Sequence, residues 1–251
     1  MATSGIVSRN ASGEEMGRLL SATYRTGLDS REQPLYTLQE AAYYIGMSSR
    51  TLDTWFFGRS YPKKSGPGRW QPVFTPADPD LKLLSFFNLA EAHVLAATRY
   101  DHKVPFWAVR EAITNVTAAS PQFTKHPLLS DEFFTNGKLL FVKKIEEYVN
   151  VSSKQLSLDI IEAFLVRVMK DEEGNPFKVY PLRKGESDDK IISIMAGVSS
   201  SRPIIDDAGI PVLTIWRRYK AGEEERFIAE DFEIDVGKVK RAIEYVEHRA
   251  A

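Results

Sequence analysis

The stretch that decides the fold begins with Tyr36-Thr37-Leu38-Gln39-Glu40-Ala41-Ala42 and continues with Ser48-Ser49-Arg50-Thr51-Leu52-Asp53-Thr54-Trp55. Thr37 and Glu40 have the spacing of a capping box, in which a hydroxyl and a carboxylate satisfy each other's free backbone amides at a helix start. Ser48 stands where it can cap a second helix, and Gly46 lies between the two predicted helices and ends the first. Two short capped helices joined by a glycine-containing turn predict a helix-turn-helix.

The segment that follows predicts a basic hairpin, or wing. Between Tyr61 and Phe74 the chain has three prolines and two glycines, a density that excludes helix. The same segment carries Lys63, Lys64 and Arg69. We therefore predict a winged helix-turn-helix from about Tyr36 to Phe74.

Local charge favours DNA as the partner of this unit. Residues 36–74 hold five basic and two acidic side chains, a net +3, in a chain whose net charge is -1. A recognition helix seats its N-terminal turns in the major groove, and basic wing residues neutralise phosphates. A glycine turn alone also occurs in ordinary helical domains, so the wing and its charge carry the prediction. The residues predicted to contact DNA are Ser49, Arg50, Thr54, Arg59, Lys63, Lys64 and Arg69.

The middle of the chain predicts further helices and hairpins. We expect one helix from its cap at Asn88 to about Tyr100 and another from Pro105 to about Val116. Asn136-Gly137, inside Phe133–Leu140, is typical of a tight type I′ hairpin. Leu156–Lys170 fits either one helix or, as we favour, a helix ending near Ile161 that leads into a hairpin.

The C-terminal part predicts a three-helix unit. Two apolar sets have the spacing i, i+3, i+4, i+7 of an amphipathic helix, and Glu223–Asp231 forms a shorter helix between them. The polar stretch Arg183–Lys190 marks a candidate boundary before this unit. The expected fold is α+β, with a disordered tail (1–33), a winged-helix domain extended by helices and β-hairpins (34–188) and a trihelical domain (189–251). The first apolar set is Val212, Ile215, Trp216 and Tyr219, and the second is Val239, Ala242, Ile243 and Val246.

Several classes of function find no support in the sequence. The chain has no cysteine, its four histidines show no metal-ligand spacing, and phosphate-loop, dinucleotide and nucleophile-elbow patterns are missing. No apolar run reaches the roughly 18 residues of a membrane span, and the N-terminus does not resemble a secretory signal. We expect a cytoplasmic, non-enzymatic protein without metal, cofactor or membrane contact.

The first helix pair resembles a MerR-type winged helix. The resemblance rests on Tyr36–Ala42, on Ser49-Arg50-Thr51-Leu52 and on Trp55. That family commonly has an arginine after the Thr-Leu pair, where this sequence has Asp53. Either Arg50 or the wing then takes that role, or DNA binding has been lost.

The region Ile191–His248 resembles the small trihelical domain of VapB-type antitoxins. Leu84–Leu95 also resembles the segment that precedes this domain in longer members, whereas the usual Gly-Thr-Arg before the Ile-Pro pair ends here in Ala208-Gly209. The resemblance implies an antitoxin that represses its own operon and neutralises a PIN-like ribonuclease toxin. The matching segments are Val198–Ile205, Gly209–Val212, Ala221–Glu223, Ala229–Phe232 and Ala242–Tyr245.

Charge also favours a protein partner for this C-terminal unit. From Ile191 onward there are nine basic and eleven acidic residues, a net of -2, which suits a toxin with a basic cleft better than it suits DNA. A second helix-turn-helix, with Lys238, Lys240 and Arg241 on its last helix, is the weaker alternative. The residues predicted to contact the toxin are Arg202, Trp216, Tyr219, Glu223 and Tyr245.

Two other functions remain open at this point. A MerR-like regulator without a toxin partner would bind a small ligand among the aromatic residues of 100–182, which could equally form a core. An interaction module would keep the winged helix without touching DNA. A homodimer is expected for the repressor, because one winged helix reads only half of a two-fold operator. The aromatic residues concerned are Phe106, Trp107, Phe133, Phe134 and Phe141.

Overall fold

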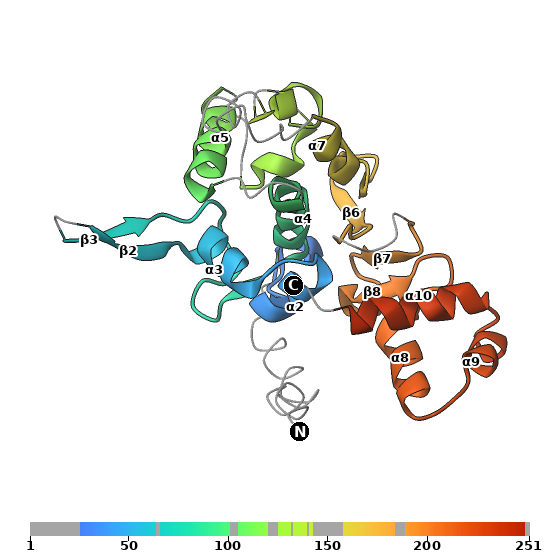
Figure 1. The fold of residues 1–251 in the computed structure, drawn as a ribbon. Coiled ribbons are helices and arrows are strands. Elements are labelled where there is room, and N and C mark those ends of the chain that lie inside the picture. The colour runs from blue at the N-terminus through green and yellow to red at the C-terminus, as the bar shows by residue number, and fades with distance from the viewer. Residues whose placement is uncertain are drawn as a thin grey trace.

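The computed structural model describes residues 26–63, 66–100, 105–119, 125–131, 133–139, 141–142, 158–183 and 189–248 (Figure 1). Helices and small antiparallel sheets alternate along the chain, which confirms the predicted α+β class. Figure 1 shows the wing at one end of the molecule, the helix α4 in the middle and the three C-terminal helices at the other end. Most of the predicted tail, residues 1–25, lies outside the described residues.

The winged helix-turn-helix has the predicted elements. Strand β1 (Tyr36–Thr37) leads into α2 (Leu38–Tyr44), and α3 (Ser49–Phe57) follows after the turn. Thr37 and Glu40 form the capping box, and the Ser48 side chain accepts from the amide of Thr51 to cap α3. The wing consists of β2 (Arg59–Lys63) and β3 (Gly66–Trp70), and β4 (Leu83–Leu84) returns to pair with β1.

The helix after the wing begins three residues earlier than predicted. Helix α4 (Phe86–Tyr100) is capped by Ser85, whose Oγ accepts from the amide of Asn88 at 3.1 Å. Asn88 Oδ1 in turn accepts from the Ser85 amide at 3.1 Å and from the Ala77 amide at 2.9 Å. Asn88 is therefore the third residue of the helix and reaches back to the cap. The next helix, α5 (Phe106–Ala119), follows as predicted.

The hairpin predicted over Phe133–Leu140 is wrong. After the short 3-10 helix η3 (Pro127–Leu129), the chain forms a π-helical turn, η4 (Phe133–Gly137), that contains Asn136-Gly137. Its helical path places Phe133 and Phe141 together in the core, with ring centroids 5.8 Å apart. Burial of two rings outweighs the local turn preference of Asn-Gly, because propensity is a weak determinant beside tertiary packing.

The favoured interpretation of Leu156–Lys170 is confirmed, although the helix runs further than expected. Helix α7 (Leu158–Leu165) leads into a hairpin of β5 (Val168–Lys170) and β6 (Pro176–Val179). This hairpin belongs to a five-stranded antiparallel sheet in chain order, completed by β7 (Ile192–Met195), β8 (Pro203–Ile205) and β9 (Ile210–Pro211). No pattern in the sequence predicted β7 to β9. The sheet crosses the candidate boundary, since β6 pairs with β7, and the domain division stays a prediction.

The three predicted C-terminal helices are present as α8 (Val212–Lys220), α9 (Glu225–Asp231) and α10 (Val236–Glu247). They pack around a core of their own that includes Ile215, Ile228 and Ala242. A larger core extends from Tyr36 through α4 and α5 to Ile194. The common sheet contributes to both cores, through Val179 and Ile194 to the larger one and through Ile192 and Ile205 to the smaller one.

Residues that the sequence assigned to the end of the tail make specific contacts. The 3-10 helix η2 (Ser30–Glu32) is capped by Asp29, and Arg31 forms an ion pair with Asp171 at 2.6 Å. Glu32 pairs with Lys125 at 2.5 Å. Order therefore begins by Asp29, earlier than the predicted start near Tyr36.

Candidate nucleic-acid interface

Helix α3 presents a polar face outward and an apolar face to the core. Leu52, Trp55 and Phe56 are buried, whereas Ser49 and Arg50 are exposed. Thr54 is half-buried, and its hydroxyl donates to the backbone carbonyl of Arg50 at 3.0 Å. The first turns of α3 thus carry the groups that a major groove would meet.

The wing extends this outward face. Arg59 and Arg69 are exposed on β2 and β3, and the Arg69 guanidinium donates to the Phe57 carbonyl at 3.5 Å. Lys63 lies at the end of β2, opposite Gly66. Lys64 and the side chain of Lys63 lie outside what the structure describes.

The arginines of this region lack the carboxylate partners that most other described basic side chains have. Arg50, Arg59 and Arg69 form no ion pair with another described residue, and the same holds for Arg110 on α5. Elsewhere most described basic side chains are paired with carboxylates, for example Lys170 with Asp131 and Arg218 with Asp231, both at 2.7 Å. Unneutralised guanidinium groups on one surface favour an anionic partner.

Asp53, which weakened the sequence prediction, is neutralised within the fold. Its carboxylate forms an ion pair of 2.8 Å with Lys82, from the segment before β4. The Lys82 ammonium also lies 5.0 Å from the centre of the Phe57 ring. The carboxylate therefore adds little net negative charge to α3. The sequence carried no signal for this pair, because Lys82 lies 29 positions away in a loop.

Aromatic stacking fixes the base of the wing. The rings of Tyr61 and Trp70 lie 5.2 Å apart, and Trp70 stacks on Phe106 of α5 at 5.3 Å with an angle of 20° between the planes. A Cβ at Gly68 would stand 2.5 Å from the Tyr61 ring, so glycine permits this packing. The wing is thereby held between α3 and α5.

A small cavity marks the place where these three elements meet. Its volume is about 180 Å³, and Arg50, Thr54 and Arg59 line it together with the aromatic pair Trp70 and Phe106. The structure therefore brings together the predicted recognition-helix residues and the first arginine of the wing. Sequence reasoning missed the contribution of α5.

The turn between α2 and α3 is attached to the C-terminal unit by a buried arginine. Arg183 is 2% exposed and donates to the carbonyls of Tyr43 at 3.1 Å and Tyr245 at 2.7 Å. Its side chain packs against Gly46, where a Cβ would stand 2.8 Å from the Arg183 Cβ. The Tyr43 hydroxyl donates to the Val246 carbonyl at 2.6 Å. The Arg183 guanidinium and the Tyr43 hydroxyl thus both connect the helix-turn-helix to the end of α10.

Two of the predicted toxin-contact residues belong to this junction. Tyr245 is 1% exposed, and its hydroxyl donates to the Tyr44 carbonyl at 2.9 Å. Arg202 forms an ion pair with Glu40 of the capping box at 3.2 Å. Arg202 follows a stretch, Ser199–Ser201, in which all three residues have positive φ. Tyr245 is therefore a packing residue, and the expectation that its side chain meets a partner is wrong.

The other three predicted toxin-contact residues lie on α8 or just after it. Trp216 and Tyr219 are half-buried on α8, and Glu223 forms an ion pair with Arg218. Tyr219 and Glu223 line a cavity of about 710 Å³ between α8 and α9. The chain is strongly acidic here, with seven acidic residues and one basic residue in 221–235. The five predicted residues thus fall into two separate groups.

His93 and His126 are surrounded by packed side chains and show no metal-binding arrangement. His93 is fully buried on α4 against the Phe164 ring, and burial lowers its pKa to about 3. His126 contacts Glu91 at 2.7 Å and Glu32 at 3.1 Å. Burial raises the pKa of the Glu91 carboxyl. Within the described ranges no group of three or more histidine, aspartate or glutamate side chains is arranged so that it could hold a metal ion, and no helix is long and apolar enough to cross a membrane.

Known proteins resemble this chain in part and at a distance. Residues 34–113 match the family described as "Putative DNA-binding HTH domain". A relative named "Putative antitoxin VapB45", from Mycobacterium tuberculosis (strain ATCC 25618 / H37Rv), is 23% identical over 233 residues, covering 85% of this chain and 94% of the relative. The crystal structure of Rv2018 from Mycobacterium tuberculosis shares the fold, with a TM-score of 0.61 and 21% identity, over 84% of this chain and 97% of that one.

Proposed function

We propose that this protein is the antitoxin of a type II toxin–antitoxin pair. It binds operator DNA through the winged helix, represses its own operon and neutralises a PIN-like ribonuclease by protein contact. The helix-turn-helix family match and the relative named as an antitoxin support the two halves of this proposal. Both partners belong to the cytoplasm, where we place the protein.

The observation that carries the DNA half is the set of unneutralised arginines on the face formed by α3 and the wing. Arg50 lies with Ser49 and Thr54 on the helix that would enter the major groove. We assign contacts with backbone phosphates to the wing and to Arg59 at its base. A homodimer would present two such faces to a two-fold operator. The residues assigned to phosphate are Arg59, Lys63, Lys64 and Arg69.

The test of the DNA half is the salt dependence of binding to the DNA upstream of the gene. Replacing Arg59 or Arg69 by alanine removes one phosphate contact each and should reduce the slope of log affinity against log salt by about one. Arg226→Ala, on the exposed face of α9, is the matched control and should leave the slope unchanged. An unchanged slope in both wing variants would contradict DNA binding by this surface.

The toxin half rests on the acidic C-terminal unit. The segment 221–235 carries seven acidic residues and includes α9, which lies at the opposite end of the molecule from the wing (Figure 1). Tyr219 and Glu223 line a cavity beside this segment. A ribonuclease with a basic RNA-binding cleft is electrostatically complementary to such a surface. Trp216 lies on the same helix as Tyr219 and completes the proposed contact, while Arg202 supports it from the junction.

Co-expression tests the toxin half separately. The reading frame next to this gene should encode a PIN-like nuclease whose toxicity the full-length antitoxin suppresses. A Tyr219→Ala, Glu223→Ala double variant should lose the suppression. Arg50→Ala should keep it, because Arg50 belongs to α3, which lies well apart from α9 (Figure 1). Growth arrest that persists with the unmodified antitoxin would refute this half alone.

A further inference from the structure

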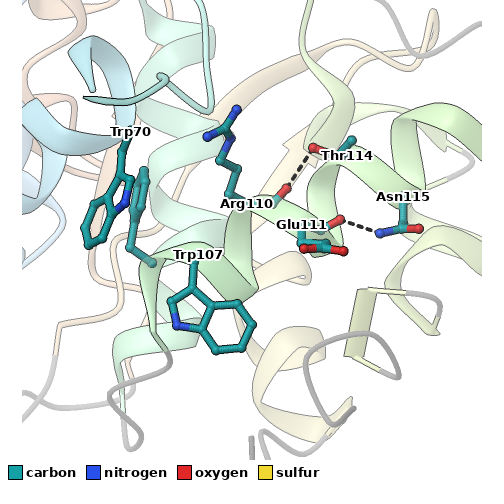
Figure 2. A pocket seen from close by; sticks show the side chains of 7 residues that line it. Trp70, Trp107, Arg110, Glu111, Thr114 and Asn115 are labelled. Carbon is teal, nitrogen blue, oxygen red and sulfur yellow. Dashed lines mark hydrogen bonds between the residues drawn. The ribbon is translucent and has the colours of Figure 1, made fainter. Parts of the chain in front are cut away.

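A further cavity, larger than the one that borders Arg50, opens beside the base of the wing on the surface of α5. Its volume is about 450 Å³, within the range of roughly 300 to 1,000 Å³ that small-molecule sites occupy. Figure 2 shows Trp70 and Trp107 on one side and the polar side chains of α5 on the other. Phe106, which stacks on Trp70, is the third aromatic residue of the lining. The lining thus combines flat apolar surfaces with a few polar groups.

The aromatic side of the cavity is built from two elements that are distant in the sequence. Trp70 comes from the wing and stacks on Phe106 of α5 with 20° between the ring planes. Trp107 follows on α5 and is 45% exposed. Such rings favour a planar aromatic molecule, because offset stacking and edge contacts add to the burial of apolar area.

Arg110 supplies the charge that the cavity offers to a ligand. It forms no ion pair with another described residue, whereas the neighbouring Glu111 already has an interaction partner. Figure 2 shows the guanidinium extending away from the Glu111 carboxylate. The side chains of Thr114 and Asn115 donate to the α5 carbonyls of Arg110 and Glu111 at 3.0 and 2.7 Å. A guanidinium fork in this position matches a carboxylate.

The cavity is in contact with the candidate DNA surface. Trp70 and Phe106 line both this cavity and the smaller one that also borders Arg50 and Arg59. A ligand that displaces either ring therefore acts on the packing that holds the wing beside α3. Occupancy of one cavity would change the position of the phosphate-binding arginines.

We propose that this cavity binds a small planar aromatic carboxylate, with its ring against the three aromatic side chains and its carboxylate on Arg110. The bound ligand alters the position of the wing and so regulates DNA binding. The ligand site stands independently of the proposed antitoxin function, whereas the regulatory effect rests on DNA binding.

Calorimetric titration of the full chain with 1-naphthoate tests the site without DNA. The neutral 1-naphthamide should bind at least about tenfold more weakly, because it cannot form the charge-assisted contact. Arg110→Gln should abolish the preference for the carboxylate, and Trp107→Ala should weaken both probes. The control Leu213→Ala removes an equally exposed apolar side chain from α8 and should change neither affinity.

Two results would overturn the ligand site: no binding of naphthoate, or equal binding of naphthoate and naphthamide. An undiminished naphthoate affinity in Arg110→Gln would overturn the assignment of the carboxylate. The regulatory step is tested by titrating DNA with and without saturating naphthoate. If DNA binds equally in both cases, the coupling is wrong and the site remains; if DNA never binds, the proposed function fails and the calorimetry still decides the site.

Discussion

Neutralisation of Asp53 is the residue-scale feature on which the DNA surface depends. The carboxylate lies on α3, the proposed recognition helix, and the 2.8 Å pair with Lys82 would keep its charge from repelling phosphate. Both side chains are partly exposed, so the pair itself contributes little to stability. Its importance is in the local potential that DNA would meet.

Removing Lys82 should therefore lower DNA affinity. In Lys82→Ala the unpaired carboxylate of Asp53 should weaken binding by roughly two- to fivefold at low ionic strength, and salt should reduce the difference. Fluorescence anisotropy with labelled upstream DNA measures this change. The double variant Lys82→Ala, Asp53→Ala should recover the original affinity. Failure to recover would mean that Lys82 acts on DNA directly.

The His126–Glu91 pair predicts how stability depends on pH. Burial alone would lower the pKa of His126, but its hydrogen bonds and its charge interactions with Glu91 and Glu32 outweigh burial and raise it. Folding then favours protonated His126. The stability that the protonated histidine contributes is fully present below its unfolded pKa of about 6.5, and it is lost as pH rises through its folded pKa. His93 acts in the opposite sense, because its lowered pKa costs stability as pH falls.

The contribution of His126 is isolated by comparing the free energy of unfolding of a variant with that of the original protein at two pH values. Denaturant unfolding between about pH 6 and pH 8 should show that His126→Gln loses more stability, relative to the original protein, at the lower pH. His248→Gln removes a histidine outside the cluster and should show a difference that does not vary in this way. A His126→Gln difference that is constant with pH would contradict the proposed coupling to Glu91.

At the scale of elements, the wing depends on Trp70. Two aromatic contacts hold it, one within the hairpin and one to α5. None of the described residues of β2 and β3 belongs to the hydrophobic core. A two-stranded hairpin has little stability by itself in water. The wing should therefore open locally more easily than the helices beside it.

Trp70→Ala should accelerate trypsin cleavage within the wing, at Arg59, Lys63 or Arg69, without unfolding the rest. Loss of the two ring contacts should cost about 1 to 2 kcal/mol locally, which corresponds to roughly a five- to thirtyfold faster cleavage. Limited proteolysis followed by mass spectrometry locates the cut. Trp70→Phe keeps an aromatic ring and should restore much of the resistance. Equal cleavage of Trp70→Ala and the original protein would show that the stack is not needed.

At the scale of the whole molecule, Arg183 joins the two packing centres. It donates to backbone carbonyls of both the helix-turn-helix and the α10 end, and its guanidinium lies 4.0 Å from the centre of the Tyr245 ring. Groups buried in this way are costly to leave without partners. The junction thus connects the helix-turn-helix directly to the C-terminal unit.

Arg183→Leu should destabilise the protein by about 2 to 4 kcal/mol, because buried carbonyls lose their donor. The milder Tyr43→Phe removes a single hydroxyl and should cost about 1 kcal/mol. Denaturant unfolding followed by circular dichroism measures both. Tyr219→Phe, on a half-buried tyrosine of α8, is the control and should cost less than either. If Arg183→Leu unfolds like the original protein, the junction does not couple the two parts.

Sequence reasoning succeeded where local chemistry decides the structure. The caps at Thr37 and Ser48, the prolines and glycines of the wing and the periodicity of α8 and α10 are signals within a few residues. It failed where contacts between residues distant in the sequence decide the structure. Asn136-Gly137 became helical because two phenylalanines are buried around it, and β7 to β9 are too short to have a pattern of their own. Asp53–Lys82 and the Arg183 junction are long-range pairs that no spacing rule predicts.

The arrangement of charge along the molecule has a consequence for how the protein approaches its partners. Figure 1 places the basic wing and the acidic helix α9 at opposite ends. Such a separation of charge gives the protein a large electric dipole although its net charge is only -1. In the field of a DNA duplex the molecule would rotate wing-first before any contact forms, so that a greater share of collisions begins in a productive orientation. The α9 end would then point into solution, open to a second partner.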